Sequence, residues 1–257
     1  MMKIDNPAFD YDNRGAQYSG QRKTEPKIAA YVYKALGTAK TVLNVGAGSG
    51  SYEPGDRYVV AVEPSVAMRN QRIANGKAPA INAYGDQLPF NDRAFDAVTA
   101  FVTIHHWPDM KKGLLELKRV ARDKVIIMTF DPDSLDRFWN AHYFPEVIAV
   151  EKQRYPTIPF ITDALGAGCS VWEVPVPLHC VDGFQEAFYG RPEAFLNDEV
   201  RKAQSAWGFI PASTQAVIVK RLADDLASGE WDRRYGFYRT QPSFTCALRL
   251  IICNIQG

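Results

Sequence analysis

A glycine turn at residues 46–50, with glycine at every second position, stands between two apolar runs at 41–45 and 58–62. Glycine takes positive φ without strain and presents no Cβ to a ligand. In open α/β sheets such a turn lies at the carboxyl end of a strand, where these sheets bind ligands. The second run ends on Glu63, 17 positions after the first glycine (63 − 46). That spacing is close to the ~20 positions typical of a carboxylate that binds a ribose, so the stretch predicts a ribose-containing ligand.

The sequence His105-His106-Trp107 is a second candidate for chemistry. Histidine is a common general base because its ordinary pKa is near neutrality. The run at 97–104 predicts a strand that is buried on both faces. Adjacent side chains of a strand point to opposite faces, so we do not expect the two imidazoles to bind one metal ion, and a structural role is favoured over a catalytic one. Zinc spacings, phosphate loops and a Ser-His-Asp signature are absent from the sequence, and we expect no metal.

The elements that would position these residues alternate between strand and helix. The expected helices include 26–36, closed by Gly37, and one that Asp109 caps; the expected strands are 41–45, 58–62, 97–104, 124–130, 170–176 and 244–253. This alternation indicates a doubly wound α/β fold with a mostly parallel sheet.

Composition narrows the class of protein. With 257 residues, of which 46% are hydrophobic, the chain can bury a core as one large domain or one domain with an inserted cap. The net charge of +1 creates no field that would attract nucleic acid or an anionic membrane, so we expect neither as a partner. Neither a spanning apolar run nor a signal-like amino terminus is recognisable, which favours a cytoplasmic protein.

The cysteines show no C-x-x-C spacing, and a chain of this size needs no disulfide framework. We therefore interpret all four as buried, inert thiols: Cys169, Cys180, Cys246 and Cys253.

Residues 18–130 resemble the class I S-adenosylmethionine (SAM) dependent methyltransferases, in the small-molecule branch that includes the quinone-biosynthesis type. The resemblance rests on the glycine turn with Glu63, the turn Leu88-Pro89-Phe90, Phe95-Asp96, and His105-His106-Trp107. It implies a seven-stranded, mostly parallel Rossmann-like sheet whose antiparallel last strand lies between the fifth and sixth, with a helical cap. The implied cofactor is SAM, and the product S-adenosylhomocysteine.

The resemblance also implies a division of the chain. Residues 1–37 would form an arm and helix over the cofactor, and residues 38–130 the SAM-binding half. Residues 131–257 would complete the sheet of the same domain and carry an inserted helical cap that chooses the substrate.

The cofactor contacts that the resemblance implies run through the first half of the chain. Tyr18 and Arg22 would face the methionine carboxylate, Glu63 would accept from the ribose hydroxyls, and Met68 would pack on the adenine. The full predicted set is Tyr18, Arg22, Asn44, Gly46, Ala47, Gly48, Glu63, Pro64, Met68, Gly85, Asp86, Phe101 and Val102.

Two positions depart from the family pattern. Asn44 stands where the family usually has an acid, so it offers no charge to the cofactor's ammonium group. Tyr84 stands where many members have an aspartate. We therefore expect the Gly85 backbone and the Asp86 carboxylate to contact the adenine edge.

The predicted reaction is in-line methyl transfer from SAM to a small acceptor, for which the protein mainly supplies alignment and excludes water. A general base is needed only for a hydroxyl or an acidic carbon, and the candidates are His105, His106 and Asp131. The aromatic residues of the distal half suit an apolar or aromatic acceptor.

Other functions stay open at this point. An NAD-dependent oxidoreductase would share the sheet and Glu63 but would need G-x-G-x-x-G. A non-catalytic SAM-binding protein and a peptide methyltransferase are further alternatives. The balanced charge and the absence of an N-P-P-Y tetrapeptide argue against DNA or RNA as the acceptor. The sequence identifies neither the acceptor, nor the atom methylated, nor the oligomeric state.

Overall fold

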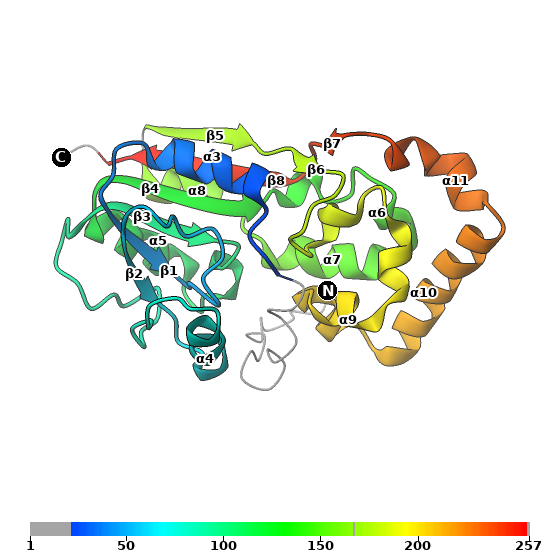
Figure 1. Cartoon of the computed structure of the whole chain (residues 1–257), viewed down its shortest axis with the longest axis horizontal. Coiled ribbons are helices and arrows are strands. Elements are labelled where there is room, and N and C mark those ends of the chain that lie inside the picture. Colours follow the sequence, from blue (N-terminus) through cyan, green and yellow to red (C-terminus); the bar gives the residue numbers. More distant parts are fainter. Residues whose placement is uncertain (1–21, 167, 256–257) are drawn as a thin grey trace.

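Short strands form the central sheet of the computed structural model, which describes residues 22–166 and 168–255 (Figure 1). Its six strands are β1 (Thr41–Val45), β2 (Tyr58–Val62), β3 (Phe95–Phe101), β4 (Ala121–Phe130), β5 (Cys169–Glu173) and β8 (Leu248–Asn254), in the order β2-β1-β3-β4-β8-β5. Strands β1 to β4 pair in parallel, and β8 is antiparallel to both β4 and β5. The predicted doubly wound fold and the antiparallel insertion of the last strand are therefore confirmed.

The predicted seventh strand is reduced to one parallel bridge between Val62 and Ile81. The Ile81 N–H donates to the Ala61 carbonyl at 2.8 Å, and the Glu63 N–H donates to the Ile81 carbonyl at 3.0 Å. Pro79, two residues earlier, has no N–H to donate to a ladder. The pairing therefore stays confined to Ile81 at this edge.

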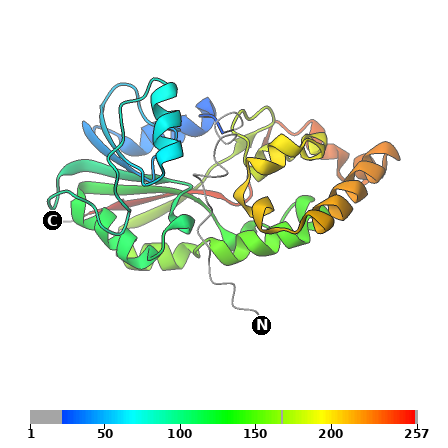
Figure 2. The same ribbon diagram turned by 90° about the horizontal axis from the view of Figure 1, so that it is seen from below.

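Helices cover both faces of the sheet (Figure 2). Helix α3 (Pro26–Leu36) packs on β4 and β8, and α5 (Met110–Val120) packs on β3 and β4. Helix α8 (Ile158–Leu165) lies against α5 and β8. The predicted caps are present: Gly37, with φ 56°, ends α3, and the Asp109 carboxylate accepts from the Lys112 N–H at the start of α5.

A helical lobe stands beside the sheet (Figure 1). Its α-helices are α6 (Asn140–Tyr143), α7 (Pro145–Arg154), α9 (Asp198–Lys202), α10 (Ala212–Ala227) and α11 (Glu230–Tyr235). The chain enters it after β4, returns to the main sheet for α8 and β5, and then forms the rest of the lobe before β8; a small sheet of β6 (Val176–Pro177) and β7 (Ser243–Phe244) joins the two parts. The lobe thus stands at the edge where the parallel strands end.

Aromatic side chains fill the interior of this lobe. The ring of Trp139 lies 5.6 Å from that of Trp231 and 5.7 Å from that of Phe195, and its indole N–H donates to the Tyr189 carbonyl. Many of the distal aromatics therefore form a core.

Cys169 and Cys253 lie directly opposite each other on β5 and β8 and are joined by a disulfide. The interpretation of these two as inert thiols was wrong, because the pairing of strands 84 residues apart brings them together, which their spacing does not reveal. Cys180 and Cys246 are buried free thiols, as predicted, and burial raises the pKa of Cys180 to about 12. Among the described residues, no helix combines the length and apolar character needed to cross a bilayer.

Candidate active site

An outer cavity of about 450 Å³ opens where β1, β2 and β3 end. Tyr18 lies outside the described residues, and Asp86 does not line the cavity. All the other predicted cofactor residues line it: Arg22, Asn44, Gly46, Ala47, Gly48, Glu63, Pro64, Met68, Gly85, Phe101 and Val102.

The glycine turn at its floor needs glycine for two separate reasons. Gly46 and Gly48 have φ of 67° and 52°, in the region that side chains strain. A Cβ on Gly46 would lie 2.1 Å from Thr103 Oγ1, and one on Gly48 would lie 3.3 Å from Met68 Cε. The turn is therefore a cradle whose backbone comes close to the space that a ligand would fill.

Glu63, at the end of β2, is fixed in place by backbone donors. One carboxylate oxygen accepts from the Gly48 N–H at 2.8 Å and the other from the Ser65 N–H at 2.9 Å. The side chain is 7% exposed and lines the cavity. Its carboxylate thus ties the glycine turn to the start of α4 (Val66–Ala74) and presents an anionic group at the position predicted for a ribose.

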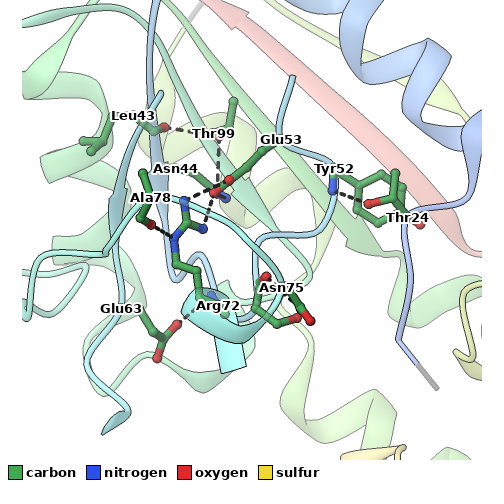
Figure 3. Close-up of polar contacts among 12 residues, drawn as sticks. Thr24, Leu43, Asn44, Tyr52, Glu53, Glu63, Arg72, Asn75, Ala78 and Thr99 are labelled. Atoms are coloured by element: carbon green, nitrogen blue, oxygen red, sulfur yellow. Dashed lines mark hydrogen bonds and ion pairs between the residues drawn. The ribbon is translucent and has the colours of Figure 1, made fainter. Parts of the chain in front are cut away.

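Behind the turn, a buried charge lies next to Asn44 (Figure 3). The Asn44 amide donates to Glu53 Oε1 at 2.9 Å. Arg72 donates to both oxygens of Glu53, at 2.6 and 2.9 Å, and Arg72 and Glu53 are 1% and 7% exposed. The Thr99 hydroxyl donates to the Asn44 side-chain oxygen Oδ1 at 3.4 Å. The acid expected at position 44 is thus replaced by a neutral amide with a carboxylate behind it, a pairing that no sequence pattern indicated.

Arg22 and Tyr52 meet at Asp182, which comes from the loop that follows β6. Arg22 forms an ion pair with Asp182 at 2.6 Å, and the Tyr52 hydroxyl donates to the other oxygen at 2.7 Å. Burial, followed by the charge of Asp182, raises the pKa of Tyr52 well above its usual value. The wall of the outer cavity therefore joins the arm, the glycine turn and the distal half of the chain, and sequence patterns pointed only to Arg22.

At the opposite end of the cavity, Gly85 packs against an indole. A Cβ on Gly85 would lie 2.7 Å from Cε2 of Trp107, and both residues line the cavity together with Tyr84. Gly85 thus lines the cavity beside the indole of Trp107, and the contact of Gly85 and Asp86 with an adenine edge stays a prediction.

A smaller inner chamber of about 40 Å³ lies on the lobe side of the outer cavity and shares three lining residues with it: Arg22, Val102 and His106. Aromatic rings form part of its wall, with the ring of Phe130 lying 5.5 Å from Tyr155 and 5.4 Å from Phe184.

Buried polar atoms without hydrogen-bond partners among the described residues surround this inner chamber. They are the amide nitrogen and oxygen of Asn140, Oε2 of Glu151, Nε2 of Gln185, Oε2 of Glu186, Oε1 of Gln204 and Nδ1 of His105. Buried polar groups are normally hydrogen-bonded, and leaving one unpaired costs about 1–3 kcal/mol. Their gathering around one chamber is the feature expected of a site that a polar ligand completes.

The histidine pair is not on a strand, which corrects the sequence prediction. Strand β3 ends at Phe101, Val102 takes a positive φ of 50°, and His105 and His106 lie in a 3-10 helix. Their rings are 3.9 Å apart instead of pointing to opposite faces. Burial, and then nearby positive charge, lowers the pKa of both imidazoles well below the usual value, so both are neutral near pH 7.

Asp131, the third predicted base, lines neither cavity. Its Oδ1 accepts from the Asp133 N–H, and its Oδ2 accepts from the Ser134 hydroxyl and pairs with Arg249 at 3.2 Å. The structure places it as the cap of a 3-10 helix and does not bring it to the site.

The buried carboxyl of Glu186 should make stability depend on pH. It is 1% exposed, and burial raises its pKa to about 7. Because the raised pKa belongs to the folded state, the folded chain keeps a proton that the unfolded chain has already lost above pH ~4.5, and stability falls as pH rises toward 7. We expect the unfolding free energy of Glu186→Gln, relative to wild type, to rise by about 2–3 kcal/mol between pH 5 and pH 8 in urea titrations. A difference that is constant with pH would contradict this.

Comparisons with known proteins agree with this geometry. Residues 43–129 match the family model described as a methyltransferase domain. A solved protein of Anabaena variabilis, described as a methyltransferase from an antibiotic biosynthesis pathway, is 25% identical with a TM-score of 0.83, and the match covers 91% of this chain and 98% of that one.

Two more distant proteins are also similar. The solved geranyl diphosphate C-methyltransferase of Streptomyces coelicolor, in complex with Mg²⁺, geranyl diphosphate and S-adenosylhomocysteine, is 12% identical with a TM-score of 0.51 over 89% of this chain and 77% of that one; at this identity the likeness is one of fold. The tRNA (carboxymethyluridine(34)-5-O)-methyltransferase of Schizosaccharomyces pombe is 22% identical over 45% of this chain. That match spans only half the length of the curated relative.

Proposed function

We propose that this chain, a class I methyltransferase whose methyl donor is SAM, methylates a small molecule that reaches the donor from the inner chamber. The methyltransferase activity, the donor and the Rossmann-like fold agree with the predictions from the sequence. The acceptor and the roles of single residues are our proposals.

The outer cavity suits the donor in three respects. The Gly46–Gly48 backbone lines the cavity, the Glu63 carboxylate is held at the end of β2 where it would accept from ribose hydroxyls, and Met68 is placed to pack on the adenine. Arg22, at the border of both cavities, would pair with the methionine carboxylate.

SAM supplies an electrophilic methyl group on its sulfonium, so the chain's own contribution is alignment and exclusion of water. Val102 and His106 line both cavities, and they would hold the acceptor in line with the methyl group. Alignment of this kind can lower the barrier by ~7–11 kcal/mol.

One observation carries the choice of a small acceptor. The inner chamber is small, about 40 Å³, and is lined by polar and aromatic side chains, and several of their buried hydrogen-bonding atoms have no partner within residues 22–166 and 168–255. A duplex or a folded RNA would need an open, positively charged surface, whereas the net charge here is +1.

The three segments of the chain take corresponding roles in this proposal. Residues 1–37 would close over the donor, residues 38–130 would bind it, and the helical lobe within residues 131–257 would select the acceptor as part of the same domain. We propose a cytoplasmic location, where SAM is available.

The test measures donor binding and methyl transfer separately. SAM and S-adenosylhomocysteine should stabilise the protein against heat, by about 2.7 kcal/mol at a hundred times the dissociation constant, and NAD should not. Methyl-labelled SAM would then be supplied with a panel of small metabolites or with total tRNA. We expect label in a small metabolite. Label in tRNA alone would contradict the proposal, and donor binding with no transfer at all would favour the non-catalytic alternative.

A further inference from the structure

Glu151 contributes one of the buried oxygen atoms of the inner chamber that have no hydrogen-bond partner among the described residues. It lies in the last turn of α7, and its Oε2 is inaccessible to solvent and has no partner among the described residues. Arg154, three positions further along the helix, donates through its two terminal nitrogens to the Ser205 hydroxyl at 2.9 Å and to His106 Nδ1 at 3.1 Å, and its Nε has no hydrogen-bond partner among the described residues. A carboxyl oxygen in this position can accept a hydrogen bond or a proton from a molecule in the chamber.

The neighbouring imidazoles are poorly suited to accept that proton. Arginine can only donate, so His106 Nδ1 is the acceptor of their contact and the ring proton sits on Nε2. His105 lies with its ring centre 3.9 Å from that of His106 and 4.2 Å from that of Tyr155. The positive charges of Arg154 and Arg22 oppose protonation of both rings.

Burial and nearby positive charges together set the pKa of the Glu151 carboxyl. The positive charges of Arg154 on its own helix and of Arg22 both act on the Glu151 carboxyl, and the two nearby imidazoles are neutral. Burial raises the pKa of Glu151 to about 7, and the two arginines act against that rise. A general base works best when its pKa is close to the pH of the reaction.

Glu186, the other buried carboxyl of the chamber, has a different setting. Its Oε1 accepts from the Ala247 N–H at 2.7 Å, and the arginine that acts on it is Arg249, which lines neither cavity. Glu151 instead responds to Arg22, which lines both cavities. Of the two carboxyls, Glu151 is thus the one coupled to the junction with the outer cavity.

We propose that the inner chamber receives the reactive end of an aromatic acceptor that carries an O–H or N–H, and that Glu151 removes this proton during transfer. The proposal rests on the proposed function and names the substrate class of the same site. The lone pair of the acceptor oxygen or nitrogen forms the new bond to the methyl carbon, and the S–CH₃ electron pair stays on sulfur. The acceptor proton moves to Glu151 Oε2 and afterwards to solvent.

The walls of the chamber support this acceptor class. Phe130, Tyr155 and Phe184 offer apolar faces to a flat ring. The Asn140 amide is 1% exposed, and both its ends lack partners among the described residues, so it can donate to and accept from a substituent on that ring.

The test compares Glu151→Gln with Glu146→Gln, a matched change on the exposed side of the same helix. Phenol and aniline serve as methyl acceptors, anisole as a ring without a removable proton, and methyl-labelled SAM as donor. We expect Glu151→Gln to slow transfer to phenol or aniline by about 10²–10⁴-fold, while SAM affinity measured by calorimetry stays within about two-fold. The wild-type rate should rise with pH through about 7 and lose that dependence in Glu151→Gln. Glu146→Gln should behave as wild type.

Several outcomes would overturn the proposal. One is an unchanged rate in Glu151→Gln, whether or not Glu186→Gln slows the transfer. Another is failure of both phenol and aniline to be methylated while SAM binds. Methylation of anisole at the same rate as phenol would also count against it, because anisole has no removable proton. Failure of the wild type to bind SAM would instead refute the proposed function, so the two ideas fail in different measurements.

Discussion

Replacement of Gly46 by alanine should abolish measurable SAM binding and destabilise the fold. Gly46 has a φ of 67°, and a Cβ there would lie 2.1 Å from Oγ1 and 2.9 Å from Cβ of Thr103. The backbone strain alone costs about 1–3 kcal/mol, and the collision forces the segment after β3 away from the turn. We expect a loss of at least about 3 kcal/mol in the unfolding free energy and at least a hundred-fold weaker SAM binding, about 2.7 kcal/mol. Urea unfolding and calorimetry measure the two effects.

A matched control lies in the same loop. Gly55 has no positive φ, and no atom lies within 4 Å of the position that a Cβ would take there, so Gly55→Ala should change neither quantity noticeably. The double variant Gly46→Ala/Thr103→Ala removes the 2.1 Å contact with Oγ1 but keeps the 2.9 Å contact with the Cβ of residue 103 and the strained φ. It should therefore recover part of the stability. Wild-type SAM affinity in Gly46→Ala would show that the turn is not the donor site.

The donor side of the site could be predicted because its signals are local in the chain. A strand, a glycine turn and an acid-tipped strand, all within residues 41–63, fold next to one another and line the same cavity. The glycines indicate positive φ directly, and the caps at Ser65 and Asp109 are likewise set by neighbours in sequence.

The end of β3 shows where local signals fail. The apolar run continues to Ile104, so its pattern predicts a strand up to the histidines. The strand stops at Phe101 because Val102 takes a positive φ, which a β-branched residue rarely adopts and no sequence pattern indicates. The Val102 N–H donates to the Met128 carbonyl on β4 at 2.7 Å, so this conformation is accompanied by a contact with a residue distant in sequence.

The inner chamber was also beyond sequence reasoning, because its polar residues come from separate elements. Asn140 begins α6, Glu151 lies in the last turn of α7, and Glu186 and Gln204 lie 35 and 53 residues beyond Glu151 (186 − 151 and 204 − 151). The residues next to each of them in sequence form no recognisable motif, and only the folded chain brings them around one chamber. Distant polar residues that meet in a fold leave no spacing to recognise.

Removal of the Glu53 carboxylate should be among the most damaging single changes in the chain. Arg72 is 1% exposed and donates two hydrogen bonds to Glu53, so Glu53→Gln leaves a buried guanidinium without its counter-charge. Breaking a buried ion pair from one side typically costs about 3–5 kcal/mol, and we expect a loss in this range by urea unfolding. As a control, Glu230→Gln removes one partner of a solvent-exposed pair with Arg233 and should leave the unfolding free energy nearly unchanged, because water screens such pairs.

The neighbouring amide allows the charge to be moved instead of removed. Asn44→Asp alone places a second carboxylate 2.9 Å from Glu53 Oε1, where the amide nitrogen now donates, and should be destabilising through repulsion. In Asn44→Asp/Glu53→Gln the net charge returns to that of the wild type, and the amide introduced at position 53 can donate to the new carboxylate. The double variant should therefore be more stable than the sum of the single changes predicts, by about 2 kcal/mol. Because position 44 lines the outer cavity, its new charge should also strengthen SAM binding over Glu53→Gln. Two results together would show that Asn44, Glu53 and Arg72 do not act as one charged unit. The losses of unfolding free energy in the single variants would add up to that of the double variant, and Glu53→Gln would lie within about 0.5 kcal/mol of wild type.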